Sequence, residues 1–212
     1  MSDRAIVFID GNNFYHALKA IGVADLGRLD YAKISAKIAG PAREWRATRY
    51  YVGQVNQAES PRLYADQRRF FAALVATDGR ISHYVGRLET RYVENAAATE
   101  LLELLRSLPM KIDLSVYRKL DALGRRHQRT AVKVEKAVDV MIAVDMVSLA
   151  RQDAFDSAYL FSADGDLTPA VEEVRRVGKR AYIASPRRGA QLAAAANTFI
   201  KLVQLWFADC RM

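Results

Sequence analysis

Short apolar runs alternate along this chain with segments whose apolar side chains recur every three or four residues. The short runs have the length of buried strands, and the periodic segments have the spacing of amphipathic helices. Strands alternating with helices are typical of βαβ units around a parallel sheet. The pattern therefore predicts an α/β fold. The expected strands are 6–9, 45–52, 81–85, 131–134, 157–161 and 180–184.

Local start and stop signals place helices between these strands. Asn12 or Asn13 is expected to cap the first helix, Asp30 caps the second, and Pro61 precedes a third. We expect one domain covering 1–212, because no linker or repeat interrupts the elements. The other expected helices are 99–108, 137–150, 167–177 and 189–196, while 199–207 fits either a strand or a helix.

The regular alternation breaks between about 86 and 129, and we expect a basic inserted segment there. Between 106 and 136, nine lysines and arginines stand against three acidic residues. A solvated helix face is the alternative for any one of these residues. An exposed face of the insertion is also a candidate surface for a homodimer. The residues expected to contact nucleic acid are Arg118, Lys119, Arg125, Arg126 and Arg129, with Lys111 nearby and Tyr117 and His127 as stacking candidates.

Composition narrows the class of protein. The chain has 212 residues, of which 51% are hydrophobic, and a formal net charge of +8. That charge favours a polyanionic partner, and nucleic acid is the leading candidate. No apolar stretch is long enough to span a membrane, and the amino terminus lacks a secretion signal. A lone cysteine, Cys210, excludes an internal disulfide and a cysteine-rich zinc site, so we expect a cytoplasmic protein.

Two of the expected strands run directly into acidic residues. The carboxyl ends of parallel strands meet at one sheet edge, where ligands bind. Either acidic tip alone fits an ordinary turn, but the two together predict a site. The first tip, after 6–9, is Asp10, Gly11, Asn12 and Asn13; the second, after 157–161, is Ser162, Ala163, Asp164, Gly165 and Asp166.

A further pair of acids lies in the expected helix 137–150, which is otherwise apolar on every side except for Ser148. Such a helix should be buried. Asp139, in the first turn, is either a metal ligand or an acid favoured by the helix dipole. For Asp145, nearly two turns further on, we favour a structural acid that accepts hydrogen bonds in the core.

Asp10, Asp139, Asp164 and Asp166 are thus expected to converge at one sheet edge. Carboxylates that repel one another are best explained by a cation, and oxygen ligands favour Mg²⁺ or Mn²⁺. Such an ion can activate water and polarise a phosphoryl oxygen. The residues therefore indicate hydrolysis of a phosphodiester.

These motifs resemble those of NYN-domain proteins of the LabA-like type, in the PIN-like nuclease superfamily. The resemblance rests on 8–15, 135–140 and 162–169, in this order and spacing. The chain departs from the family pattern at Ala137, where glycine is usual, and at Leu167, where an aromatic residue is frequent. Both departures leave every acid in place.

The resemblance implies a three-layer α/β/α sandwich with a mainly parallel, doubly wound central sheet, PIN-like or Rossmann-like in type. It also implies a metal-dependent endoribonuclease acting on single-stranded or structured RNA. In that family pattern Asp10, Asp139 and Asp164 bind the metal, and Asp166 is a supporting or second-metal acid.

The same resemblance gives supporting roles to residues around the acids. Asn13 would orient Asp10 or a phosphate, and Ser162 would support the tip of the last acidic strand. Asn12 and Lys136 would contact the nucleic acid. A solvated lysine is the alternative for Lys136.

Two other functions stay open. A non-catalytic RNA-binding or regulatory scaffold would keep the same fold without cleaving RNA. A haloacid-dehalogenase-like phosphatase also uses an aspartate after its first strand, but it requires a second acid two residues later, where this chain has Asn12. Of the histidines, His16 on the first helix is the candidate for substrate contact.

Overall fold

The computed structural model describes residues 3–108 and 113–212. The chain divides into two compact units, one comprising Met1–Arg87 with Glu135–Met212 and the other comprising Leu88–Val134. Lys111, one of the basic residues of the expected insertion, lies outside the described residues. The assignment of 1–212 to a single domain with an insertion at about 86–129 stays a prediction.

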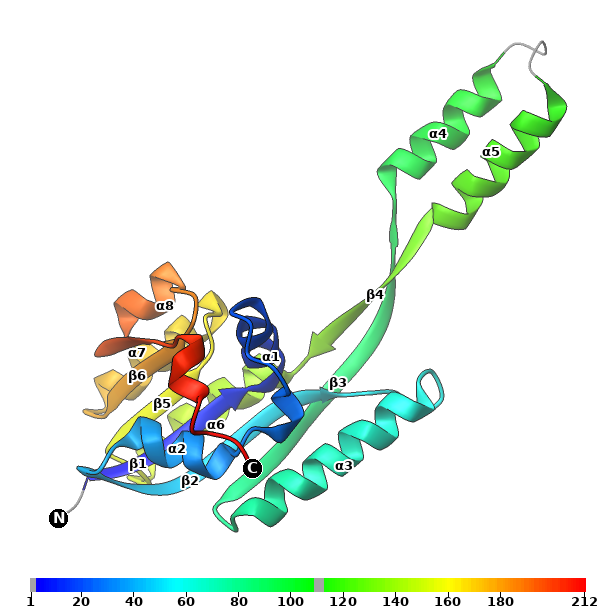
Figure 1. The fold of residues 1–212 in the computed structure, drawn as a ribbon. Coiled ribbons are helices and arrows are strands. Elements are labelled where there is room, and N and C mark those ends of the chain that lie inside the picture. Colours follow the sequence, from blue (N-terminus) through cyan, green and yellow to red (C-terminus); the bar gives the residue numbers. More distant parts are fainter. Residues whose placement is uncertain (1–2, 109–112) are drawn as a thin grey trace. The chain divides into compact units, whose positions relative to one another are not determined.

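Seven strands among the described residues form one mostly parallel sheet (Figure 1). The strand order is β4-β3-β2-β1-β5-β6-β7, and the pairs along β3-β2-β1-β5-β6-β7 are all parallel. The predicted α/β fold with a mainly parallel sheet is therefore confirmed. The strands are β1 Asp3–Asp10, β2 Arg43–Gln54, β3 Ile81–Glu94, β4 Arg129–Lys136, β5 Ser157–Phe161, β6 Arg180–Ser185 and β7 Thr198–Lys201.

Helices connect the strands, and most lie where the apolar spacing predicts them. The segment expected as a strand or a helix, 199–207, contains both a strand and a short 3-10 turn. The helices are α1 Gly11–Ala20, α2 Tyr31–Ala39, α3 Pro61–Thr77, α4 Ala96–Ser107, α5 Leu114–His127, α6 Val138–Arg151, α7 Thr168–Arg176 and α8 Ala190–Ala195. The 3-10 turns are η1 Leu26–Arg28, η2 Gly165–Leu167 and η3 Gln204–Phe207.

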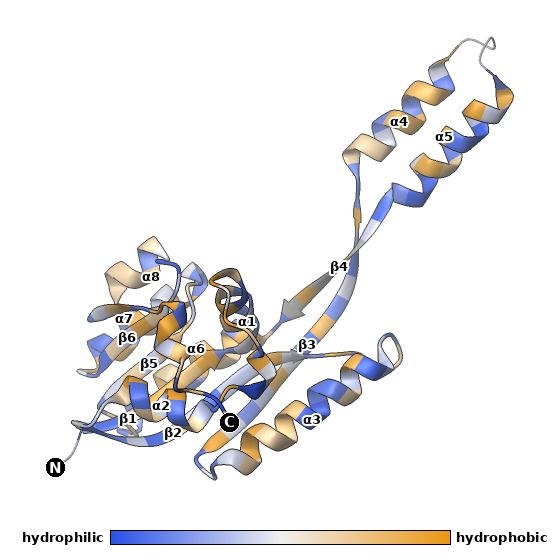
Figure 2. Ribbon diagram, viewed as in Figure 1, coloured by the Kyte–Doolittle hydropathy of each residue, from blue (hydrophilic) through white to orange (hydrophobic). Residues whose placement is uncertain are grey.

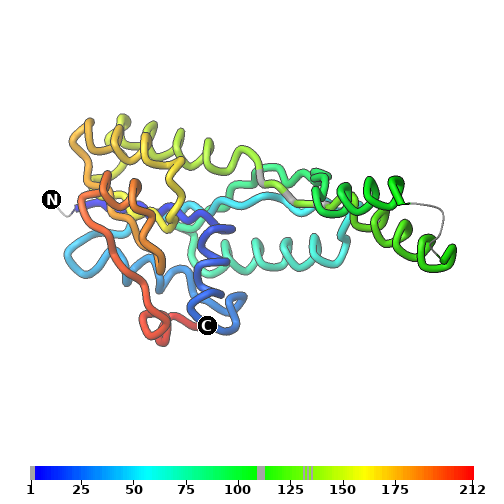
Figure 3. The backbone as a smooth tube through the Cα atoms, turned by 90° about the horizontal axis from the view of Figure 1, so that it is seen from above, coloured from blue at the N-terminus to red at the C-terminus, as the bar shows by residue number. Residues whose placement is uncertain are grey.

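The side chains of β1 alternate between two buried apolar clusters. Val7 and Ile9 belong to a cluster that includes Leu18 of α1 and Ile34 of α2. Phe8 belongs to a second cluster, built with residues of α6 and α7. In Figure 3, α6 and α7 lie on one side of these strands, and α1 and α2 lie on the other. β1 is thus buried on both faces, as expected for a central parallel strand.

The first helix is capped by Asp10, so the expectation of a cap at Asn12 or Asn13 is wrong. The Asp10 carboxylate accepts a hydrogen bond from the backbone N–H of Asn13 at 3.1 Å. A carboxylate at this end of a helix pairs with free N–H groups and with the positive end of the dipole. The second cap is confirmed, because Asp30 accepts from the backbone N–H of Lys33 at 3.0 Å.

The prediction that α6 is buried on every side is wrong. Val138, Ile142 and Met146 lie in the core, but Val140 and Val144 are 64% and 56% exposed. Each exposed valine follows a buried residue by two positions, which is about 200° around the helix. α6 therefore presents one apolar side to the sheet and another to the surface.

Ala137, immediately before α6, has a φ of 71° and so lies in the left-handed region. This is the position at which the family resemblance leads one to expect glycine. We expect Ala137→Gly to raise the free energy of unfolding by up to about 1 kcal/mol, because glycine adopts positive φ without the steric cost of a Cβ.

Urea unfolding of both proteins measures this difference. The matched control is Ala36→Gly, an exposed position in the interior of α2, which should lower the free energy of unfolding by about 1 kcal/mol. A loss of stability of similar size in both variants would contradict the strained backbone at Ala137.

Candidate metal and RNA site

The candidate site begins where β1 ends. Asp10 is only 4% exposed, and its carboxylate accepts hydrogen bonds from the backbone N–H of Asn13 and from the hydroxyl of Ser162, at 3.1 and 3.0 Å. The next residue is Gly11, and a Cβ at this position would lie only 2.7 Å from the ring of Tyr50. The local sequence thus fixes the position of a buried carboxylate at the strand tip.

The tip of β5 is joined to the tip of β1 by hydrogen bonds. β5 pairs in parallel with β1, so the two tips are neighbours. The side-chain oxygen of Asn13 accepts from the backbone N–H of Ala163 at 3.2 Å. The Ser162 hydroxyl, which donates to Asp10, accepts from the backbone N–H of Asp164 at 3.1 Å. Asn13 and Ser162 therefore fix the two acidic tips relative to each other.

Asp164 caps the turn that leads into α7. Its carboxylate accepts from the backbone N–H of Asp166 at 3.0 Å, and the 3-10 turn η2 starts directly after it. Asp166 is exposed at the first turn. The segment therefore contains the expected turn and the expected start of a helix, and the two acids lie within them.

The acids share a local electrostatic field. Burial raises the pKa of Asp10 to about 6, and the charges of Asp139 and Asp164 contribute to the rise. Burial also raises the pKa of Asp139, with further contributions from the charges of Asp164 and Asp166. The structure therefore brings the four carboxylates named by the sequence close enough for the charges of their neighbours to act on Asp10 and Asp139.

The chemistry of this group suits a hard divalent cation. Among the described residues, no three histidine, cysteine, aspartate or glutamate side chains already form a tight metal-binding cluster. Mg²⁺ typically keeps several waters and takes only one or two protein carboxylates beside phosphate oxygens. A set of partly separated carboxylates at one sheet edge fits that mode of binding.

Asp145 belongs to a separate network of hydrogen bonds and ion pairs, with Tyr51 and Arg49 of β2. The hydroxyl of Tyr51 donates to the Asp145 carboxylate at 2.7 Å, and the guanidinium of Arg49 lies 2.9 Å from the same oxygen. Burial, followed by the hydrogen bond to Asp145, raises the pKa of Tyr51 above its usual range. These contacts anchor α6 to β2, in keeping with the structural role expected for Asp145.

The expected RNA-binding residues of the insertion fall in the unit Leu88–Val134. Arg118, Lys119, Arg125 and Arg126 are exposed on α5, and Arg129 begins β4. The guanidinium of Arg125 donates to Asp121 at 2.7 Å, one turn earlier in the same helix. Lys136 is half-buried at the end of β4 rather than at a helix start.

A groove beside the acidic tips contains two arginines that were not among the predicted site residues. It has a volume of about 650 Å³, and its lining includes Asn12, His16, Arg187 and Arg188. Both arginines are exposed, and the guanidinium of Arg188 lies 5.9 Å from the ring of Phe199. They follow β6, so the rule that ligands bind beyond the carboxyl ends of parallel strands could have found them.

Gly189 brings the arginine loop against the acidic loop. A Cβ at Gly189 would collide with the backbone carbonyl of Ala163, so only glycine permits this approach. Ser185 holds the start of the loop, because its hydroxyl accepts from the backbone N–H of Arg187 at 3.3 Å. The two arginines are therefore held next to the acids by the fold.

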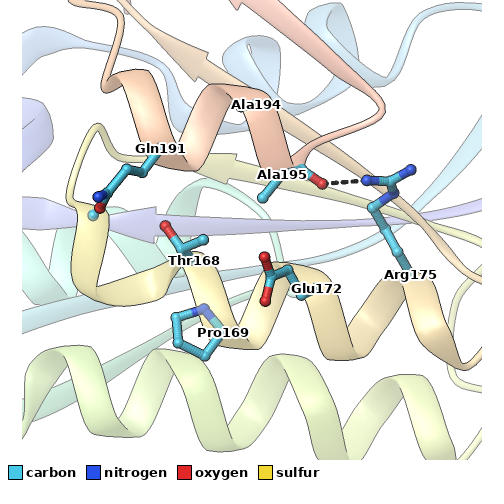
Figure 4. A pocket seen from close by; sticks show the side chains of 8 residues that line it. Thr168, Pro169, Glu172, Arg175, Gln191, Ala194 and Ala195 are labelled. Atoms are coloured by element: carbon cyan, nitrogen blue, oxygen red, sulfur yellow. Dashed lines mark hydrogen bonds between the residues drawn. The ribbon is translucent and has the colours of Figure 1, made fainter.

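A second pocket lies between α7 and α8 (Figure 4). Thr168, Glu172 and Gln191 line it, but Arg175 is occupied by a hydrogen bond to the backbone oxygen of Ala195 at 2.6 Å. Glu172 is the one carboxylate among the described lining residues. The pocket thus lacks the cluster of acids found at the strand tips.

Comparison with known proteins finds a family model that is similar to part of this chain. The NYN domain model matches residues 115–203, which include Asp139, Asp164 and Asp166 but not Asp10. This match supports an NYN domain and, at a coarse level, a nuclease-like function related to RNA. No curated protein matches the chain.

One solved structure with the same fold is that of a protein of unknown function from Vibrio parahaemolyticus. The TM-score is 0.56 and the sequences are 18% identical, over 100% of this chain and 97% of the other. At this identity the likeness concerns the fold alone. In the described part of the chain, no helix is both long and apolar enough to cross a membrane.

Proposed function

We propose that this protein is an endoribonuclease of the LabA-like NYN type that hydrolyses RNA with Mg²⁺ or Mn²⁺. The observation that carries the proposal is the gathering of Asp10, Asp139, Asp164 and Asp166 at the carboxyl edge of the sheet, where hydrogen bonds join the tips of β1 and β5. The NYN match over residues 115–203 supports the same class of function. We include in the proposal a cytoplasmic location and a three-layer, doubly wound arrangement of the fold.

In this proposal Asp10, Asp139 and Asp164 hold the cation, and Asp166 supports it from the first turn after β5. When bound, the cation supplies an activated water and stabilises negative charge on the phosphate. Ser162 and the backbone of Asn13 keep the Asp10 carboxylate in one orientation by their hydrogen bonds. Burial raises the pKa of Asp10 to about 6, so this carboxyl group is ionised at neutral pH.

The groove next to the acids gives the RNA backbone a path to them. Arg187 and Arg188 offer guanidinium groups to phosphates, while Asn12 and His16 offer hydrogen bonds from α1. Positive groups beside the acids also offset the repulsion between carboxylates and RNA. A phosphomonoesterase would not need such an open, basic channel.

The direct test is cleavage by the purified full chain. Labelled single-stranded RNA, structured RNA and single-stranded DNA are incubated with Mg²⁺, Mn²⁺ or EDTA. We expect internal cleavage of RNA with either metal and none with EDTA. Binding of RNA without cleavage in any metal would favour the scaffold, and hydrolysis of small phosphomonoesters alone would favour the phosphatase.

The groove makes its own prediction. Replacing both Arg187 and Arg188 by alanine is expected to raise the KM for single-stranded RNA about tenfold or more with a smaller effect on kcat, because the arginines bind phosphates away from the bond that breaks. The slope of log affinity against log salt should fall by about 0.7 for each phosphate that the variant no longer neutralises.

The control for this variant removes the same charge elsewhere. Arg62 and Arg68 are exposed on α3, and their double replacement by alanine should leave KM within about twofold of the wild-type value. Equal effects of the two double variants would show that net charge, rather than the groove, governs RNA binding.

The basic side chains of α5 and of the start of β4 are proposed as a further RNA contact. Replacing Arg118, Arg125 and Arg129 by alanine is expected to weaken binding of long single-stranded RNA and to reduce the salt slope, while short RNA is cleaved at the wild-type rate. Fluorescence anisotropy at several salt concentrations measures the slope. An unchanged slope would leave these residues as ordinary solvated side chains.

A further inference from the structure

The helical hairpin of α4 and α5 leaves much of its apolar surface exposed. The start of α4 lies beside the end of α5, since the backbone N–H of Asn95 donates to the oxygen of Gln128 at 2.9 Å. Leu104, Val116 and Leu123 are 57%, 46% and 46% exposed. A pair of helices requires a further layer to bury a second apolar face. The buried residues within the two helices are Ala98, Leu102, Leu105 and Gly124.

On α4 the exposed apolar residues form a continuous stripe. Ala97, Leu101 and Leu104 recur at spacings of four and three, and each is exposed or half-buried. The buried residues of α4 form a second stripe, which includes Leu102 and Leu105 and faces α5. Each residue of the exposed stripe directly precedes a residue of the buried stripe. Because successive residues of a helix are about 100° apart, the exposed stripe lies about 100° from the buried one, against the direction in which the helix winds.

α5 repeats this arrangement. Gly124 faces α4, because a Cβ there would lie 2.7 Å from the side chain of Leu102. Val116, Leu120 and Leu123 form a stripe about 40–100° from Gly124, again against the winding direction. Because the helices are antiparallel, offsets in the same sense bring both stripes to one side of the hairpin. Figure 2 shows hydrophobic and hydrophilic residues following each other along both helices.

Opposite charges border this apolar face. Glu100 lies at its outer edge on α4, about 40° beyond Leu104, and Arg126 lies at its outer edge on α5, about 60° beyond Leu123. The hydrogen bond between Asn95 and Gln128 and the approach of Leu102 to Gly124 place Glu100 and Arg126 at similar heights along the hairpin. Both are exposed. One edge of the face is therefore acidic and the other is basic.

We propose that this face docks a second copy of the same chain, so that two hairpins form a four-helix arrangement. A two-fold axis parallel to the helices places α4 of each copy over α5 of the other. Glu100 then lies opposite Arg126 of the partner subunit, and the pair occurs twice. The other face-to-face arrangement, with like helices stacked, brings acidic edge to acidic edge. The apolar docking face consists of Ala97, Leu101, Leu104, Val116, Leu120 and Leu123.

The charges disfavour other occupants of this face. A membrane surface attracts basic borders on amphipathic helices, whereas the α4 border carries Glu100. RNA would bind the opposite side of α5 better than this face, because Arg118 and Arg125 lie there, about 150–180° from the apolar stripe. The proposed dimer leaves those two arginines exposed.

Sedimentation velocity of the full chain tests the proposal over a range of protein concentrations. We expect a dimer for the wild type and a monomer for Leu104→Glu. The control is Leu205→Glu in η3, where an apolar side chain that is 80% exposed lies outside the hairpin, and this variant should remain dimeric. A wild-type monomer at all concentrations, or a dimer unaffected by Leu104→Glu, would overturn the proposal.

Charge reversal tests the arrangement without touching the apolar face. Glu100→Arg and Arg126→Glu are each expected to raise the dimer Kd about tenfold, since each change affects two pairs, and the double variant should return it to within about threefold of the wild-type value. Additive losses in the double variant would refute the stacking of α4 over α5. Monomers that sediment with anionic phospholipid vesicles would replace the dimer by a membrane contact. Asp164→Asn should remain dimeric, so a failure of the nuclease proposal is seen separately.

Discussion

Replacing Asp164 by asparagine is expected to lower the rate of RNA hydrolysis roughly 1000-fold while the fold is kept. The loss follows from the proposed role of this carboxylate as a ligand of the cation, which contributes several kcal/mol of charge stabilisation to the transition state. The fold should persist because the asparagine side-chain oxygen can still accept the hydrogen bond from the backbone N–H of Asp166.

Single-turnover cleavage of labelled RNA at saturating Mn²⁺ measures this loss. The control is Asp66→Asn on α3, the same chemical change at an exposed position outside the site. That variant should cleave at the wild-type rate. Cleavage by Asp164→Asn within about threefold of the wild-type rate would remove Asp164 from the catalytic group.

Replacing Asp10 by asparagine is expected to stabilise the metal-free protein at pH 8, by about 1–3 kcal/mol. Burial raises the pKa of Asp10 from its ordinary value of 3.8 to about 6. The folded state therefore holds the proton more tightly than the unfolded state, so the wild-type protein loses stability as pH rises from about 4 to about 6. Asparagine has no charge to bury and avoids this loss.

Urea unfolding in EDTA at pH 4 and pH 8 separates this effect from ordinary changes in packing. The difference between Asp10→Asn and wild type should be small at pH 4 and reach its full size at pH 8. Saturating Mg²⁺ should stabilise the wild type and leave Asp10→Asn almost unchanged. If Asp10→Asn were less stable than the wild type at pH 8 in EDTA, the buried charge of Asp10 would not destabilise the folded state, and the account would be wrong.

Local signals were enough for many elements of the fold. The expected strand 157–161 matches β5 at both ends, and Asp30 caps α2 through a hydrogen bond to the backbone three residues away. The end of β3 was not predicted, because the strand continues from 85 to Glu94, beside β4 in the sheet. Residues after 85 alternate weakly, and their conformation depends on a partner strand far along the chain.

Part of the candidate site could also be predicted from local sequence signals. Both acidic tips directly follow apolar strands. Because the carboxyl ends of parallel strands share one edge of a sheet, the sequence pattern indicates that the two tips meet there. Contacts that join distant elements were not readable, such as the hydrogen bond from Tyr51 to Asp145. Arg187 and Arg188 were not predicted because the loop after β6 carries no acid, and its approach to the acidic loop depends on the close packing at Gly189.

The central claim, that the acids at the sheet edge bind a divalent cation, is tested most directly by Mn²⁺ binding. Electron paramagnetic resonance of Mn²⁺ titrated into the full chain at pH 7.5 counts bound ions without any RNA substrate. We expect saturable binding by the wild type and by Asp66→Asn, and affinity at least about tenfold weaker in Asp10→Asn and in Asp164→Asn. Equal Mn²⁺ affinity in all four proteins would contradict the claim.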